Sequence, residues 1–176
     1  MFRRGPLIRV GLAFLAGLIL PALAFFLMGL AGLFPVAATQ PPSRIEADFA
    51  RLVVRRSLAR EARGVIVPPA PQEDATLLQG LRTYRRNCAG CHGKFAARSR
   101  WGATSFYPRV PQFAEEGSTL APAEMFIAVK HGIRGTGMGG WEVNLRDEEI
   151  WPVVWFLQRL RALPPEVEQA WKAPPQ

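Results

Sequence analysis

Three side chains with distinctive chemistry lie within five positions of the sequence. Cys88, Cys91 and His92 form a Cys-x-x-Cys-His pattern, which holds both cysteines and one of the two histidines of the 176-residue chain. Thiols at this spacing can act as a redox pair, contribute to a zinc site, close a structural disulfide or bond covalently to a haem. These chemistries differ in what they require from the neighbouring residues.

The histidine that directly follows the second cysteine decides between them. A redox dithiol does not need it and favours a strand-then-helix context, which is missing around this motif. A zinc site needs four ligands, and only His131 remains to help complete one. A haem can bond to both thiols through its two vinyl groups, with the adjacent imidazole placed over the iron. The motif therefore predicts one covalent haem c attached at Cys88 and Cys91, with His92 as an iron ligand.

The second axial ligand must come from elsewhere in the chain. Met125 lies in a predicted helix beside Phe126 and Ile127, where a methionine is usually core filler. Met138 lies between two glycines, and a glycine-rich loop can bring its thioether close to the face of a macrocycle. We therefore predict Met138 as the second ligand. His131 is the rival, although it also suits the negative end of the helix that it terminates.

Helices are expected to position these ligands. Pro122 is a typical first residue and Gly132 a typical C-terminal cap for a predicted helix over 122–131. Asp74 can cap a predicted helix over 75–87. Pro152 falls inside a third predicted helix, over 148–160, which it can bend. Three helices with two long loops make a thin core, so a buried macrocycle is expected to fill its centre. The predicted helices cover 75–87, 122–131 and 148–160, with loops over 93–120 and 133–146.

Four segments together resemble the all-helical, His/Met-ligated monohaem cytochromes c. They are "GLRTY" at 80–84, "NCAGCH" at 87–92, "KHGIRGTGMGGW" at 130–141 and "VVWFLQRL" at 153–160. The resemblance covers about 78–160 and implies an all-α domain wrapped around one haem. It also implies a close crossing of the first and last helices at Gly80 and Phe156. The family usually has proline after the axial methionine, whereas this chain has Gly139.

Further residues are expected to support the haem. The His92 ring nitrogen that faces away from iron should donate to a backbone carbonyl. The resemblance places that carbonyl in a proline-containing turn, which leaves Pro108 and Pro111 as alternatives. Three aromatic residues with polar tips are candidates to hydrogen-bond the haem propionates, with plain wall packing as the alternative. They are Trp101, Tyr107 and Trp141.

An uncharged apolar run extends from Val10 to Val36. It exceeds the roughly 20 residues needed to cross a bilayer and the roughly 7–15 apolar residues of a cleaved signal peptide. We therefore predict a retained transmembrane helix. Arg3, Arg4 and Arg9 precede it without an acid, so the positive-inside rule predicts a cytoplasmic N-terminus and a periplasmic haem domain.

A basic linker follows the span, with six arginines against three acids over 37–72. Ser43 and Glu46 form a capping box for a helix over about 43–63, and Gly64 is expected to cap its C-terminus. This helix is expected to be a solvated connector, to lie on the membrane or to dock a larger complex. The predicted organisation is a cytoplasmic tail (1–9), a transmembrane helix (10–36), the linker (37–72), a cytochrome c domain (73–163) and a C-terminal tail (164–176).

The function predicted from these features is electron transfer. The chain shows no hydrolytic constellation, no phosphate-binding loop and no nucleic-acid motif, and its net charge of +8 lies mostly near the membrane. An iron with both axial positions filled has no place for a substrate, which favours an electron carrier over an enzyme. The expected partners are membrane lipid and redox proteins, either as a tethered carrier or as a subunit of a larger redox complex. The alternative is a haem-based sensor in which Met138 leaves and a small molecule binds.

Overall fold

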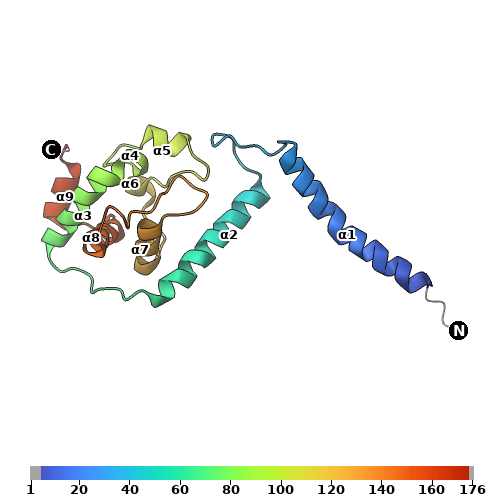
Figure 1. Ribbon diagram of the computed structural model, residues 1–176. Coiled ribbons are helices and arrows are strands. Elements are labelled where there is room, and N and C mark those ends of the chain that lie inside the picture. Colours follow the sequence, from blue (N-terminus) through green and yellow to red (C-terminus); the bar gives the residue numbers. More distant parts are fainter. Residues whose placement is uncertain (1–4, 175–176) are drawn as a thin grey trace. The chain divides into compact units, whose positions relative to one another are not determined.

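The protein is all-helical over the part that the structure describes. The computed structural model describes residues 5–174, which contain helices, loops and one isolated β-bridge between Lys94 and Ala97. The chain divides into two compact units, Met1–Ala37 and Ala38–Gln176 (Figure 1). The all-α prediction is thereby confirmed.

The first unit contains a single long apolar helix, α1 (Gly5–Leu30). Its segment Arg9–Leu30 is long and apolar enough to cross a membrane, and none of its most apolar window is buried against protein. The helix begins before the predicted span of 10–36 and ends at Leu30, because the chain turns at Gly32, which has a φ of 67°. Arg3 and Arg4, which support the predicted orientation, lie outside the described residues.

Three helices build the core of the second unit: α3 (Asp74–Asn87), α7 (Pro122–His131) and α8 (Asp147–Arg159). Their positions match the predicted helices within one residue. One detail differs, since Asp74 lies in the first turn of α3 while Glu73 occupies the cap position. Gly132 caps α7 as predicted, with a φ of +73° that favours glycine.

Helices α3 and α8 cross at a glycine. A Cβ atom added to Gly80 would collide with the backbone carbonyl of Pro152 and come within 3.0 Å of the Phe156 Cβ. The Tyr84 ring packs on the Phe156 ring beside this crossing, with centroids 5.6 Å apart, and neither side chain is accessible to solvent. The close crossing implied by Gly80 and Phe156 is therefore present, and it anchors the haem motif at the end of α3.

Short helices occupy segments that the sequence analysis assigned to loops or tail. They are α5 (Arg100–Thr104), α6 (Phe113–Glu116) and α9 (Pro165–Lys172), and a further short helix, α4 (Ala89–His92), lies within the Cys-x-x-Cys-His motif. Helix α9 lies in the predicted tail and packs against α3, with Val167 and Trp171 buried. Arg85 of α3 holds its C-terminus by donating to the carbonyls of Ala170 and Ala173 at 2.6 and 2.7 Å.

The linker helix is also present, as α2 (Arg44–Glu61), which continues into the 3₁₀ turn η1 (Ala62–Gly64). The hydroxyl of Ser43 accepts from the Glu46 N–H at 3.2 Å, as the capping signal predicted. Gly64 does not cap α2 but ends η1. α2 packs against α7, with Leu58 buried, and residues 65–72 then lead to α3 without regular structure.

Candidate haem site

One helical turn positions the two cysteines and His92. The N–H of Cys88 donates to the Tyr84 carbonyl at 2.8 Å, which ends α3. The N–H groups of Cys91 and His92 then donate to the Cys88 carbonyl at 3.1 and 2.9 Å, forming α4. The Tyr84 hydroxyl donates to the Gly93 carbonyl at 2.7 Å and so fixes the far end of this turn. The local hydrogen bonds therefore bring both thiols and the imidazole to one short segment.

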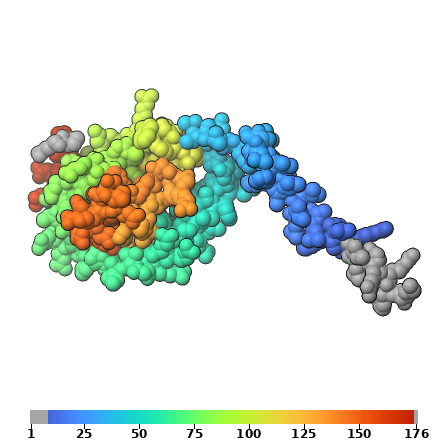
Figure 2. Space-filling model, in the orientation of Figure 1, coloured from blue at the N-terminus to red at the C-terminus, as the bar shows by residue number. Residues whose placement is uncertain are grey.

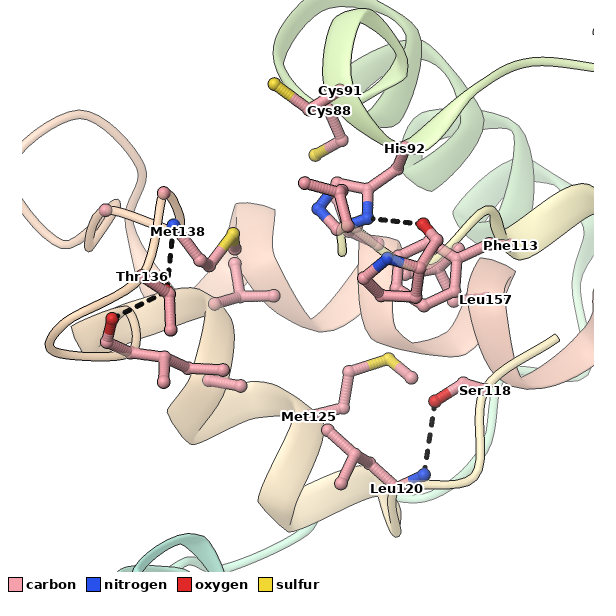
Figure 3. Close-up of a pocket in the computed structure, with 18 of the residues that line it drawn as sticks. Cys88, Cys91, His92, Phe113, Ser118, Leu120, Met125, Thr136, Met138 and Leu157 are labelled. Atoms are coloured by element: carbon pink, nitrogen blue, oxygen red, sulfur yellow. Dashed lines mark hydrogen bonds between the residues drawn. The ribbon is translucent and has the colours of Figure 1, made fainter. Parts of the chain in front are cut away.

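These three side chains line a cavity of about 460 Å³, within the roughly 300–1,000 Å³ of typical ligand sites. The cavity is drawn in Figure 3, with Cys88, Cys91 and His92 on one side and helix α7 on another. Its walls are largely apolar, as a macrocycle requires. The apolar lining includes Phe106, Phe113, Leu120, Ile133, Val153 and Leu157.

The imidazole of His92 is buried and held in one orientation. Its Nδ1 lies 3.0 Å from the carbonyl oxygen of Pro111, and the ring stacks on Phe113 with centroids 4.7 Å apart. Because a carbonyl can only accept, Nδ1 carries the hydrogen and Nε2 keeps a free lone pair. Burial lowers the pKa of His92, although the hydrogen bond to Pro111 acts in the opposite direction. The ring is therefore neutral and suited to bind iron through Nε2.

Met138 enters the same cavity from a loop that is fastened at both ends. Its carbonyl accepts from the Ile133 N–H at 2.9 Å, and its N–H donates to the Thr136 hydroxyl at 3.1 Å. After the loop, the N–H of Trp141 returns to the carbonyls of Val129 and Lys130 on α7. Figure 3 shows the Met138 side chain across the cavity from His92, on the side that faces away from the hydrogen bond to Pro111.

The donor set fits a haem: two thiols, one imidazole with a free Nε2, and a thioether, all lining one apolar cavity. A family profile described as "Cytochrome C oxidase, cbb3-type, subunit III" matches residues 75–157. Residues 75–157 form a monohaem c-type cytochrome domain. The cofactor of such a domain is a covalently bound haem c with its iron. Searches of curated proteins and of solved structures found no match.

Burial sets the chemistry of the cysteines in this cytochrome c domain. Both thiols are free, so they do not close a structural disulfide. Burial, with a smaller contribution from Cys91, raises the pKa of the Cys88 thiol to about 12. A redox-active dithiol needs the opposite shift, because the thiolate is the nucleophile. The raised pKa of Cys88 therefore disfavours the dithiol interpretation.

The two rival ligands of the cytochrome c domain have different surroundings. His131 does not line the cavity, and its Nδ1 lies 3.2 Å from the Glu142 carboxylate at the surface. Met125 does line the cavity from α7, with only 3% of its surface exposed. In Figure 3 its sulfur lies away from the line between His92 and Met138. Met125 therefore forms part of the cavity wall, whereas Met138 lies across the cavity from His92.

A buried glutamine that the sequence analysis missed braces the site. Gln112 is 1% exposed, and its amide donates to the carbonyls of Cys91 and Val110, each at 3.0 Å. Its side-chain oxygen accepts from the Ser99 N–H at 2.8 Å. Gln112 thus joins the haem motif to the loop that carries Pro111. Its place directly after Pro111 in the sequence gave no signal of this role.

The candidate propionate partners divide into two groups. Trp141 lines the cavity, whereas Trp101 and Tyr107 do not. Trp101 is 59% exposed and packs edge-on against Phe106, so it supports the wall from outside. Arg109 also lines the cavity, although sequence reasoning did not select it. Its guanidinium donates to the Ala103 carbonyl at 2.6 Å, and it could also pair with a propionate.

Proposed function

We propose that the chain is a membrane-tethered electron carrier whose haem is attached to Cys88 and Cys91 and ligated by His92 and Met138. The observation that carries this proposal is the convergence of these four side chains on one apolar cavity. Bound haem c supplies an iron that alternates between its ferric and ferrous states, one electron at a time. The residues contribute by filling both axial positions of that iron and by excluding water from it.

The hydrogen bonds around the two ligands support a closed, rigid site. Pro111 and Phe113 fix the imidazole of His92, and Thr136 and Ile133 fix the loop that carries Met138. An electron carrier benefits from such preorganised ligands, because little must move when the charge of the iron changes. The same bonds compensate for the glycine that follows Met138, and they favour a carrier over a sensor with a detachable ligand.

Two further features support a membrane location. Helix α1 contains an apolar segment of sufficient length to serve as a single-pass anchor. The arginines before it favour a cytoplasmic N-terminus, which would place the haem domain on the periplasmic face of an energy-transducing membrane. The matching family is described as an oxidase subunit, and this supports docking to, or membership of, a larger redox complex.

Haem retention tests the attachment. Changing Cys88 or Cys91 to alanine removes one of the two covalent bonds and should weaken covalent haem retention. Changing both should let the haem separate from the denatured chain. Haem that stays with the denatured double variant would contradict the assignment.

Detergent extraction of the full-length protein tests its setting. We expect the protein in the membrane fraction, together with an electron-transfer complex. Recovery in the membrane fraction without any partner would favour a free tethered carrier over a complex subunit.

A further inference from the structure

Helix α2 presents two different faces. Its inner face packs against α7 of the haem domain, with Leu58 buried and Val54 and Ser57 partly buried. The side chains on its opposite face are exposed. In Figure 2 the residues of α2, in blue-green, form part of the outer surface of that unit.

The N-terminal half of this outer face is apolar. Phe49 follows Ile45 by four residues, and Leu52 and Val53 follow Phe49 by three and four, which places all four on one side of a helix. Their exposed fractions are 84%, 66%, 52% and 45%. Other large exposed apolar side chains of this unit are scattered singly or in pairs. A continuous exposed apolar stripe on one helix indicates a surface that is covered in the functional state.

The same stripe becomes basic towards its C-terminal end. Arg56 and Arg60 follow Leu52 at successive helical turns, and Arg63 lies in η1 just beyond them. All three are exposed, and none forms an ion pair with another residue of the described chain. The ion pair within α2 joins Arg51 to Asp48 at 3.0 Å, outside the stripe. The outer face therefore offers apolar side chains and free positive charge along one line.

A bilayer surface with anionic headgroups matches this combination. An amphipathic helix in the membrane interface buries its apolar residues at the headgroup boundary, and its arginines interact with lipid phosphates. Chain connectivity limits how far α2 can lie from the end of α1, because only residues 31–43 join the two helices. An extended chain gains at most about 3.3–3.6 Å per residue, so this connection reaches less than roughly 50 Å. An α1 that spans the membrane would keep α2 at high local concentration near its surface.

We propose that the outer face of α2, formed by Ile45, Phe49, Leu52, Val53, Arg56, Arg60 and Arg63, binds the anionic lipid surface of the membrane. The proposal rests on the proposed membrane anchor. Because the inner face of α2 packs on α7, and α7 lines the haem cavity, lipid binding fixes how the haem domain is presented to its redox partners. The helix then acts as an orienting bracket and not as a passive spacer.

Site-directed spin labelling of the full-length holoprotein tests this inference. A nitroxide is attached at Phe49→Cys on α2, at Leu18→Cys within α1, or at Val143→Cys, an 86% exposed position of the haem domain. Each variant is reconstituted in vesicles of phosphatidylcholine alone and in vesicles with equal parts phosphatidylglycerol. Accessibility of the label to oxygen, which enters lipid, is compared with accessibility to a water-soluble nickel chelate.

We expect the label at Leu18 to be lipid-exposed in both vesicles and the label at Val143 to be water-exposed in both. The label at Phe49 should move into the lipid interface when phosphatidylglycerol is present. Replacing Arg56, Arg60 and Arg63 with glutamine should reduce its lipid-bound fraction, roughly fivefold in the bound-to-free ratio for each arginine. Glutamine at Arg82, Arg100 and Arg159, which are exposed elsewhere, changes the net charge equally and should have little effect.

Contrary outcomes separate this proposal from the proposed function. A water-exposed label at Phe49 beside a lipid-exposed label at Leu18 would overturn the lipid surface and leave the anchor standing. Protection of Phe49 from both reagents would indicate a protein partner and would also overturn it. A water-exposed Leu18 would remove the anchor and the inference together. Labelling of the unsubstituted chain would contradict haem attachment at Cys88 and Cys91 instead.

Discussion

Replacing Gly80 with alanine adds a methyl group at the crossing of α3 and α8. The added carbon would overlap the carbonyl oxygen of Pro152 and would touch the Phe156 side chain. The carbonyl belongs to the α8 backbone and cannot rotate away, so the two helices must separate. This crossing lies close to the haem motif along α3, so the substitution tests whether the packing seen in the structure determines the stability of the domain.

Two opposing effects set the size of the change. Overpacking a tight interior site costs about 1–3 kcal/mol, and a rigid backbone neighbour places Gly80 at the upper end. Alanine in place of glycine inside a helix stabilises the folded state by about 1 kcal/mol. The net expected loss in the free energy of unfolding is about 2 kcal/mol. For a domain of this size, each kcal/mol lowers the Tm by roughly 4–8 °C, so the expected fall is about 8–16 °C.

Thermal unfolding of the holoprotein, followed by helical circular dichroism, measures this loss. Gly64→Ala is the matched control, because a Cβ at Gly64 meets no atom within 4 Å and requires no positive φ. Its Tm should stay close to that of the wild type. An unchanged or raised Tm for Gly80→Ala would refute the close crossing and, with it, the argument for how α3 is held.

Three other side chains give further predictions. Gln112→Ala should reduce the free energy of unfolding in denaturant by about 2–3 kcal/mol, because it leaves buried backbone groups without partners. Burial raises the pKa of Tyr84 above its usual 10.0, so stability should fall as the pH rises above about 10. Tyr84→Phe should lessen that fall, and an identical pH profile of the Tm would contradict this. Trp171→Ala should cost about 3–5 kcal/mol, because its ring packs on Tyr84 and Phe156 at 5.8 and 5.5 Å; a dispensable tail would give no change.

The longer helices were predictable because local signals mark both of their ends. Helix α7 begins at Pro122 and ends before Gly132, where the structure places them. Helices α5 and α6 have only five and four residues, too few for a periodic apolar pattern to develop. Helix α9 carries only two buried residues, Val167 and Trp171. Their spacing of four residues was a weak signal, and it depends on packing against α3 that the sequence alone does not reveal.

The residues of the site also differ in how far the sequence could predict them. The thiols and His92 follow from covalent chemistry at fixed spacing, so the sequence was sufficient to propose them. The carbonyl that orients His92 depends on how a loop folds back, and the structure selects Pro111 where the sequence left Pro108 equally open. Gln112 and Arg109 act through tertiary contacts across 6 to 21 residues of sequence, which no local pattern encodes.

The central claim is that His92 and Met138 together fill both axial positions of the iron of an electron carrier. The most direct measurement is the long-wavelength absorption spectrum of the oxidised protein, where a sulfur-to-iron charge-transfer band reports a thioether ligand. The band should be present in the wild type, in Met125→Leu and in His131→Ala, and it should disappear in Met138→Ala, whose reduced form should then bind carbon monoxide. A wild type that lacks the band and binds carbon monoxide at neutral pH, or a band lost in Met125→Leu instead, would contradict the account.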